Sequence, residues 1–209
     1  MAIKRIGCYL LGTKDKGLIL RPNPSQSFEC FVDASFSGEW IKKHADQAMY
    51  DPNTARSRTG YVIRYANVPL VWSSHLQTEV SLSSTKTEMI SLSAATRELI
   101  FLVRLVKETM TLVTMSINIS NSKIHCTVHE DNTGTLKIAK EYRIRPRTKH
   151  INVKYWHFNQ FMKNHKGIMM IKWIKSEDQL ADLLTKPLGP EKHDKFTQQI
   201  QGWTVINTE

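Results

Sequence analysis

The apolar positions of the chain fall into short runs that have the pattern of β-strands. Residues 28–34 form a nearly continuous apolar run that closes with Asp33, which is typical of a strand buried on both faces. Residues 60–66 and 69–73 are two further β-rich runs, and Asn67 and Val68 between them give a turn signal. We therefore predict a buried strand that is followed by a β-hairpin.

From residue 85 to residue 110 the apolar positions change to a helical period. They lie at positions 89, 92, 95, 99, 102, 103 and 106, which form one stripe along a helix. The remaining runs predict strands at 124–128 and 168–174, and helices at 132–140, 155–164, 179–186 and 191–201. A hairpin followed by alternating helices and strands implies an α/β fold in which helices flank a mixed five-stranded sheet.

The first residues of the chain are set apart by a polar stretch. Residues 3–20 predict a short amphipathic helix and then a strand at 17–20. Residues 21–27 are polar and contain two prolines, which is typical of a linker and marks a candidate domain boundary.

Two classes of protein are disfavoured by composition. No run approaches the roughly 18 uncharged apolar residues of a membrane-spanning helix, so we expect no membrane partner. The three cysteines lack the spacing of a disulfide framework or a zinc site, which fits a reducing, intracellular compartment.

The positive charge of the chain is concentrated in one segment. Lysines and arginines total 29 against 19 acids, a formal net charge of +10. Residues 137–175 hold eleven of the basic residues and one acid, so the rest of the chain is balanced at 18 of each. A localised basic stripe is typical of a protein that binds a polyanion, although a solvated surface has the same composition. We favour the polyanion because basic residues alternate at Arg143, Arg145, Arg147 and Lys149.

Four acidic residues fall at the ends of predicted elements. Asp33 closes the first strand, Glu88 lies in the first turn of the long helix, and Asp131 follows the strand at 124–128. Asp182 lies in the helix after the last strand. An α/β sheet usually carries its functional site at such element ends, so these four acids are the candidate site residues.

Two of these acids also have an ordinary structural explanation. Glu88 could complete a capping box with Thr85, and Asp131 could cap the helix that begins at Asn132. Asp33 has no such explanation, because an acid at the end of a buried strand is costly unless it is paired or bound to a metal.

For the fourth acid two alternatives stay open. Ser176 and Gln179 have the spacing of a capping box, so Asp182 could be a surface residue one turn later. Asp178 lies one turn before Asp182 and is its rival for the same role.

The acids stand in four short motifs, at Asp33–Ser35, Ser84–Met89, Glu130–Asn132 and Ala181–Pro187. Four further motifs lie at Ser57–Tyr61, Trp72–Ser74, Arg147–Ile151 and Asp178–Ala181. Taken together, these motifs resemble the ribonuclease H domain of copia-type LTR retrotransposon polyproteins. The sequence departs from the family pattern at Ser35, Lys86 and Met89, where the family usually has an acid, Glu and Tyr.

The resemblance implies a division of the chain into four parts. Residues 28–188 match the ribonuclease H domain, and residues 1–24 resemble the C-terminal end of a reverse transcriptase segment. Residues 25–27 are then a linker, and residues 189–209 are a C-terminal helix and tail.

The resemblance also implies a ribonuclease H-like fold with Asp33, Glu88, Asp131 and Asp182 as catalytic and metal-binding residues. Such a tetrad holds two Mg²⁺ ions, with Mn²⁺ as a substitute. The implied activity is a metal-dependent endonuclease that hydrolyses the RNA strand of RNA–DNA hybrids during reverse transcription. The implied partners are the reverse transcriptase and integrase segments of the parent polyprotein, in a cytoplasmic virus-like particle.

Residues expected to contact the nucleic acid are Arg58, Asn132, Arg143, Arg145, Arg147, Lys149 and His150. The alternative function is a catalytically decayed remnant that still binds nucleic acid. A retroviral-type integrase has the same fold, but its motif uses three acids rather than four. The tryptophans Trp72, Trp156 and Trp173 are expected to pack in the core.

Overall fold

The computed structural model describes residues 2–37, 52–114, 124–140, 160–163 and 168–203. Its strands are β1 (Phe28–Ser35), β2 (Arg58–Tyr65), β3 (Val68–Leu76), β4 (Cys126–Glu130) and β5 (Met169–Trp173). Its α-helices are α1 (Ala2–Thr13), α3 (Ser84–Thr114), α4 (Thr133–Lys140), α7 (Asp182–Thr185) and α8 (Pro190–Gln201). Two short 3₁₀ helices, η2 and η4, cover Pro52–Ala55 and Ser176–Asp178.

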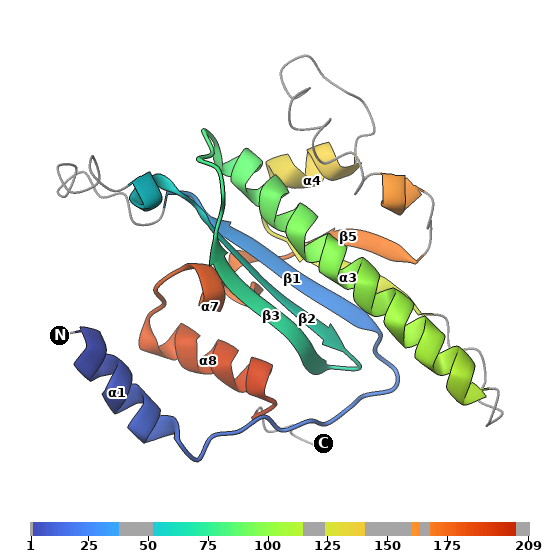
Figure 1. Cartoon of the computed structure of the whole chain (residues 1–209), viewed down its shortest axis with the longest axis horizontal. Helices are drawn as coiled ribbons and strands as arrows, with labels where there is room; N and C mark the ends of the chain where they lie inside the picture. The colour runs from blue at the N-terminus through green and yellow to red at the C-terminus, as the bar shows by residue number, and fades with distance from the viewer. Residues whose placement is uncertain (1, 38–51, 115–123, 141–159, 164–167, 204–209) are drawn as a thin grey trace.

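The five strands form one mixed sheet in the order β3-β2-β1-β4-β5 (Figure 1). β1 pairs with β2, and β2 with β3, in antiparallel directions, whereas β1, β4 and β5 run parallel. The prediction of a mixed five-stranded α/β sheet flanked by helices is therefore confirmed. Because β1 and β4 are parallel neighbours, their carboxyl ends, which carry Asp33 and Glu130, meet at one edge of the sheet.

The predicted hairpin is confirmed, and its turn has a clear physical cause. Ala66 and Asn67 have φ angles of 50° and 65°, so both central residues of the turn are left-handed. This conformation matches the right-handed twist of the two strands that the turn joins. β2 (Arg58–Tyr65) begins two residues earlier than predicted and ends one residue earlier, and β3 (Val68–Leu76) ends three residues later. The turn therefore lies at Ala66 and Asn67, one residue before the predicted Asn67 and Val68.

Side chains of β1 alternate between two apolar layers. Phe28, Cys30 and Val32 are buried in the larger core beneath α3 and α4, together with the predicted apolar stripe of α3. Phe31 points to the opposite face and packs with Phe196 of α8. Helices therefore cover both faces of the sheet, and the long helix α3 crosses one of them (Figure 1).

The N-terminal segment differs from the prediction. Residues 17–20 form no strand, so that prediction is wrong. Instead the segment lies against the end of α8, where Ile19 N donates to Gln201 O at 2.8 Å and Trp203 Nε1 donates to Gly17 O at 2.7 Å. Backbone groups in this short apolar run bond to the end of a helix rather than to a strand.

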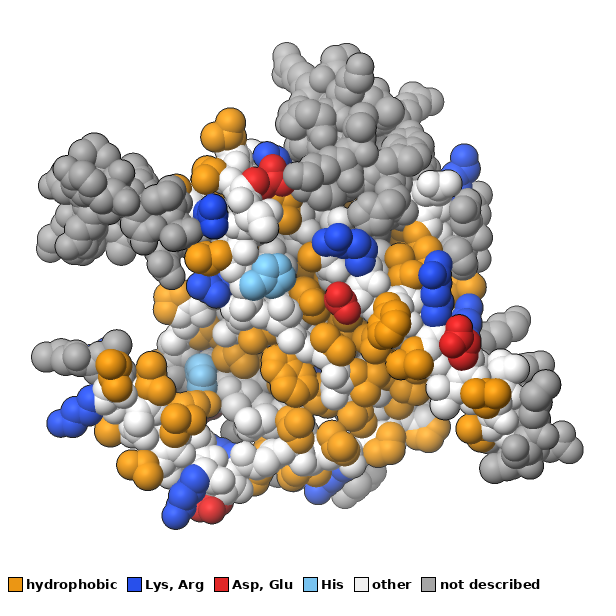
Figure 2. Space-filling view, in the orientation of Figure 1, with side chains coloured by type: hydrophobic (Ala, Val, Ile, Leu, Met, Phe, Trp, Pro, Cys, Tyr) orange, Lys and Arg blue, Asp and Glu red, His pale blue; other side chains and the backbone are white. Residues whose placement is uncertain are grey.

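Helix α1 leaves its apolar side chains in solvent. Ile3, Ile6, Leu10 and Leu11 are between 59% and 86% exposed. Hydrophobic side chains are visible on the surface of this helix at the lower left of Figure 2, where Figure 1 labels α1. Among the described residues, no helix has the length and apolar character needed to span a membrane.

Two other expectations need correction, and a third is not tested. The helix predicted at 179–186 is only the single turn of α7, preceded by η4. Trp72 and Trp173 are more than half exposed and do not belong to the core. Trp156 and most of the helix predicted at 155–164 lie outside the described residues.

Gly60 allows the one-turn helix α7 to pack closely on the sheet. Gly60 is paired with Asp33 across β1 and β2. A β-carbon at this position would lie 2.5 Å from Thr185 Cγ2 and 3.0 Å from Leu184 Cβ. Both contacts are shorter than packed atoms tolerate, so any side chain here would push α7 away from the end of β1.

We expect Gly60→Ala to lower the free energy of unfolding by about 1–3 kcal/mol, the usual cost of overpacking. Gly17→Ala is the matched control, because a β-carbon at Gly17 would meet nothing within 4 Å. Its effect should stay within about 0.5 kcal/mol. Urea unfolding followed by circular dichroism measures both values, and equal stabilities of the two variants would contradict the close approach of α7.

The boundary at residues 25–27 stays a prediction, and truncation tests it. Deleting residues 1–24 removes α1 and the exposed bonds of the segment at 17–23. Each such bond contributes on the order of 1 kcal/mol, so the remainder should still unfold cooperatively. Deleting residues 1–16 is the control, because it keeps the segment that bonds to α8. Loss of cooperative unfolding in the longer deletion alone would move the boundary to about residue 17.

Candidate metal and nuclease site

The first residue of the candidate site is Asp33, which is fully buried at the end of β1. Lys186 Nζ donates to Asp33 Oδ1 at 3.0 Å, and the hydroxyl of Thr185 donates to Asp33 Oδ2. Both partners come from the end of α7, which Gly60 allows to approach. The sequence therefore places a carboxylate in the protein interior and provides a cation and a hydroxyl to hold it there.

Glu88 reaches the site from the first turns of α3 and does not cap that helix. The N-terminus of α3 is capped by Ser83, whose Oγ accepts a bond from Lys86 N at 3.2 Å. Glu88 is instead 6% exposed, and its Oε2 has no hydrogen-bond partner among the described residues. The capping-box explanation of Glu88 is therefore wrong.

Asp131 follows β4 directly and is likewise not a helix cap. Asn132 caps α4, since its Oδ1 accepts from Thr135 N at 3.0 Å. Asp131 Oδ2 accepts from Ser176 Oγ at 2.7 Å. The helical turn at Ser176 has no side-chain cap, and the side chain of Gln179 donates instead to Val32 O at 2.9 Å. The predicted capping box of these two residues therefore does not form.

Three of the four predicted acids come together in space. One carboxylate oxygen each from Asp33, Glu88 and Asp131 lies within 4.8 Å of the other two. Anionic oxygens at such separations repel one another unless a cation lies between them. Hard oxygen donors are the ligands that Mg²⁺ prefers, and the unpartnered buried oxygen of Glu88 supplies one, so the residues present fit a divalent ion.

The fourth acid, Asp182, lies beside this cluster but is held by lysines. Lys186 Nζ and Lys192 Nζ each lie 2.7 Å from one of the two Asp182 carboxylate oxygens. The ammonium group of Lys186 thereby contacts Asp33 and Asp182 at once. Asp182 is buried, so it is not the surface residue of the alternative explanation. Its rival Asp178 is exposed and pairs with Lys195 at 3.0 Å.

Sequence reasoning missed Glu130 as part of this acidic centre. Glu130 is fully buried, its Oε1 accepts from Asn132 N at 3.0 Å, and its Oε2 has no partner among the described residues. Its position on β4 carried the signal. Cys126 and Val128 precede Glu130 by four and two residues on the same strand, so all three side chains point to the same face of the sheet. Cys126 and Val128 are apolar and face the core, so Glu130 had to face the core as well.

Burial raises the pKa of three acids of this centre, Asp33, Glu88 and Glu130. Burial, followed by the charges of Glu130, Asp33 and Asp131, raises the pKa of Glu88 far above its usual range. Burial likewise raises the pKa of Glu130 and, against the opposing effect of Lys186, that of Asp33. Burial lowers the pKa of Lys186, but Asp33 and Asp182 outweigh it and raise the pKa above its usual value.

The residues expected to bind nucleic acid are placed only in part. Arg143, Arg145, Arg147, Lys149 and His150 lie outside the described residues. Asn132 is occupied in capping α4. Arg58 begins β2 and lines a cavity next to the carboxylates.

Sequence comparison relates the chain to mobile elements. The chain is 29% identical over 201 residues to a retrovirus-related Pol polyprotein from transposon RE2 of Arabidopsis thaliana, which covers 95% of this chain and 12% of the relative. It is 28% identical over 193 residues to the one from transposon TNT 1-94 of Nicotiana tabacum, with 92% and 13% covered. The predicted resemblance to retrotransposon polyproteins is confirmed. The chain thus spans a small part of the curated relatives it matches, and no family model matches it.

Similar solved structures include ribonuclease H domains. The N-terminal domain of this type from a Mycobacterium tuberculosis protein has a TM-score of 0.48 and 13% identity, over 83% of this chain and 97% of that one. LC11-RNase H1 in complex with an RNA/DNA hybrid has a TM-score of 0.45 and 16% identity, with 80% and 97% covered. The fold assignment itself rests on the strand order and strand directions given above.

We expect the metal-free protein to lose stability as pH rises. The carboxyl of Glu88 ionises near pH 4.5 when exposed but stays protonated to far higher pH in the folded protein. The unfolded chain therefore binds fewer protons between these limits, and folding stability falls by up to about 1.4 kcal/mol per pH unit for each such group. Denaturant unfolding in EDTA from pH 5 to pH 9 measures this slope.

The variant Glu88→Gln should make the slope of unfolding free energy against pH shallower by the contribution of about one proton, because it removes one carboxyl group whose pKa is raised. Glu98→Gln is the matched control, since Glu98 is exposed on the same helix. Addition of Mg²⁺ should restore stability to the wild type at high pH. A wild-type slope equal to that of Glu88→Gln would contradict a buried, protonated Glu88.

Proposed function

We propose that the protein is a metal-dependent endonuclease that hydrolyses the RNA strand of RNA–DNA hybrids during retrotransposon reverse transcription. The observation that carries the proposal is the convergence of Asp33, Glu88 and Asp131, each contributing an oxygen within 4.8 Å of the others. The similarity to retrovirus-related Pol polyproteins supports it, because reverse transcription yields such hybrids. The ribonuclease H-like fold agrees with it.

The chain's own residues divide the work of such a site. Asp33, Glu88 and Asp131 would hold one divalent ion, and Asp182 would help to hold a second once Lys186 and Lys192 release its oxygens. Bound Mg²⁺ activates a water and stabilises the leaving oxygen of an in-line displacement at phosphorus. Lys186 neutralises charge at the edge of the cluster and keeps Asp33 oriented.

A longer polyprotein is the proposed setting of this activity. The reverse transcriptase segment would supply the hybrid, and the integrase segment would act on the finished DNA. The proposed location is a cytoplasmic virus-like particle.

One observation favours the second candidate, a nucleic-acid-binding remnant without catalysis. Both oxygens of Asp182 are paired with ammonium groups, which keeps this acid from a metal ion unless the lysines move. Titration of Mg²⁺ and Mn²⁺ with a labelled hybrid separates the two functions. A protein that binds the hybrid but cuts it with neither metal is the remnant.

We expect Asp33→Asn and Asp131→Asn each to reduce hybrid cleavage in Mg²⁺ by at least about 100-fold. Mutation of residues that only hold metal ligands in place already lowers metal affinity or activity roughly 10–100-fold. Asp178→Asn is the matched control, because it makes the same chemical change at an exposed acid outside the cluster. Circular dichroism should show the same fold for all three variants.

The substrates should be an RNA–DNA hybrid and a DNA duplex of the same sequence. The 2′-hydroxyls of RNA are the groups that distinguish the two at a protein surface. We expect cleavage of the hybrid alone. Equal cleavage of the DNA duplex would assign another nuclease class, and full activity of either Asp→Asn variant would remove that residue from the metal site.

A further inference from the structure

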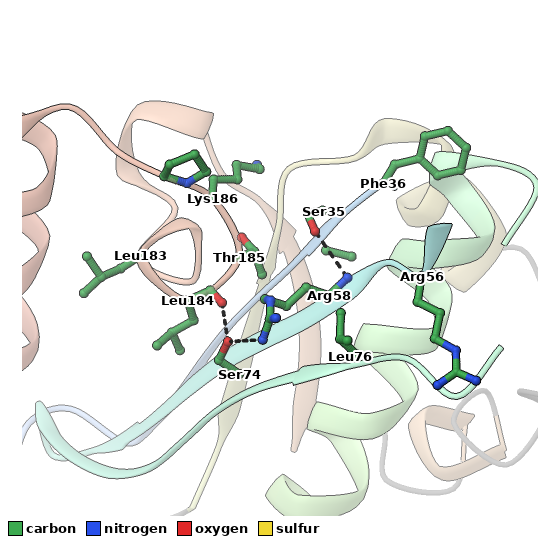
Figure 3. Close-up of a pocket in the computed structure, with 12 residues that line it drawn as sticks. Ser35, Phe36, Arg56, Arg58, Ser74, Leu76, Leu183, Leu184, Thr185 and Lys186 are labelled. Atoms are coloured by element: carbon green, nitrogen blue, oxygen red, sulfur yellow. Dashed lines mark hydrogen bonds between the residues drawn. The ribbon is translucent and has the colours of Figure 1, made fainter. Parts of the chain in front are cut away.

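Beside the carboxylate cluster lies a cavity of about 680 Å³ that the hydrolytic site does not use. We call it the lateral cavity, and its polar lining consists of Ser35, Arg56, Arg58, Ser74, Thr185 and Lys186. Figure 3 shows Phe36 and Arg56 on one side of it, and Thr185 and Lys186 on the other. The residues come from the ends of β1 and β3, the approach to β2, and α7 with the residues after it.

The lateral cavity and the carboxylate cluster share one wall. Thr185 and Lys186 line the cavity, and both also contact the carboxylate of Asp33. The wall between the two spaces is therefore a single layer of side chains. A chain-like molecule bound at the carboxylate cluster can therefore extend directly into the cavity.

The cavity carries positive charge and no acid among its lining residues. Arg58 is held in place, because its Nη1 donates to Ser74 Oγ at 3.4 Å and Ser74 Oγ donates to Leu184 O at 2.6 Å. The hydroxyl of Ser35 accepts from Arg58 N at 3.2 Å. Arginine presents a planar fork of donors that matches the oxygens of a phosphate group.

The aromatic side chain of Phe36 lies near the two arginines, and this combination is typical of nucleic-acid contact. Phe36 is 47% exposed at the rim of the cavity. Exposed aromatic rings near arginines bind the bases and phosphates of a single strand with little preference for sequence. Pockets of roughly 300–1,000 Å³ accept drug-sized molecules, so a volume of 680 Å³ has room for a whole nucleotide.

We propose that the lateral cavity holds one backbone phosphate of the nucleic-acid strand that crosses the carboxylate cluster, with Arg56 and Arg58 as its ligands. The adjoining nucleoside then lies against Phe36. The phosphate contact fixes the register of the strand relative to Asp33, as phosphate contacts do in other complexes. This inference rests on the proposed nuclease function, but its main test measures binding and does not need cleavage.

The test compares the double variant R56A/R58A with the control K4A/R5A. The control removes the same charge from α1, none of whose residues lines the cavity. Fluorescence anisotropy without divalent metal gives the Kd for a labelled RNA–DNA hybrid between 50 and 200 mM salt. R56A/R58A should raise Kd on the order of 10–100-fold and make the log–log salt slope shallower by about one per lost phosphate contact. The control should bind like the wild type.

A second readout separates a phosphate site from a general loss of charge or structure. Hybrids are prepared in which one phosphate at a time is replaced by an uncharged methylphosphonate. We expect the methylphosphonate at one position near the cleaved bond to weaken binding by the wild type. The same replacement should leave binding by R56A/R58A unchanged, and this difference between the proteins should occur at that position alone. The variant R56K/R58K should recover the salt slope but not the full affinity, because lysine keeps the charge and loses the fork.

The outcomes assign failure to one proposal or the other. The same interference pattern in wild type and R56A/R58A overturns the phosphate site, and so does a control that weakens binding equally. A wild type that binds through the cavity but cuts no hybrid overturns the nuclease function and keeps the phosphate site. A wild type that cuts, with KM unchanged in R56A/R58A, keeps the nuclease and rejects the phosphate site.

Discussion

Repulsion among buried carboxylates is the constraint on which the rest of this structure depends. Asp33, Glu88 and Glu130 are all at most 6% exposed, and they meet Asp131 at one edge of the sheet. In a medium of low dielectric such groups cannot all be charged without a cation among them. Two features of the metal-free protein meet this constraint: burial raises the pKa of Glu88 and of Glu130, which favours their neutral forms, and Lys186 lies against Asp33.

The backbone explains why residues so distant in sequence must meet. β1 and β4 are parallel neighbours, so the residues at their carboxyl ends converge on one edge of the sheet. α3 runs over the same sheet and brings Glu88 to that edge from one side. α7 approaches from the other side, and the missing side chain of Gly60 sets how close it comes. A single glycine thereby controls how well Lys186 can compensate for the burial of Asp33.

Much of this was predictable because it depends on local pattern. The hydrophobic pattern and one turn signal predicted the buried strand at 28–34, the hairpin and the long helix. The ends of the predicted elements and the motif resemblance singled out the four acids, Asp33, Glu88, Asp131 and Asp182. Side-chain pairing was not predictable, because it depends on packing between distant elements. The predicted caps at Glu88 and Asp131 failed for this reason, since both acids turn towards Asp33 of a distant strand. Ser83 and Asn132 cap the two helices instead. The strand predicted at 17–20 failed because its backbone found a partner in the end of α8.

Lys186 connects the two spaces described above, and its geometry bears on how a substrate would enter. Its ammonium group contacts Asp33 and Asp182 on one side and lines the lateral cavity on the other. A divalent ion among the acids would weaken the attraction that holds this ammonium group, because the ion and the lysine compete for the same carboxylates. A phosphate in the lateral cavity would attract this ammonium group away from the carboxylates and towards the cavity. Metal binding and phosphate binding therefore favour the same displacement of Lys186, so each should strengthen the other through one side chain.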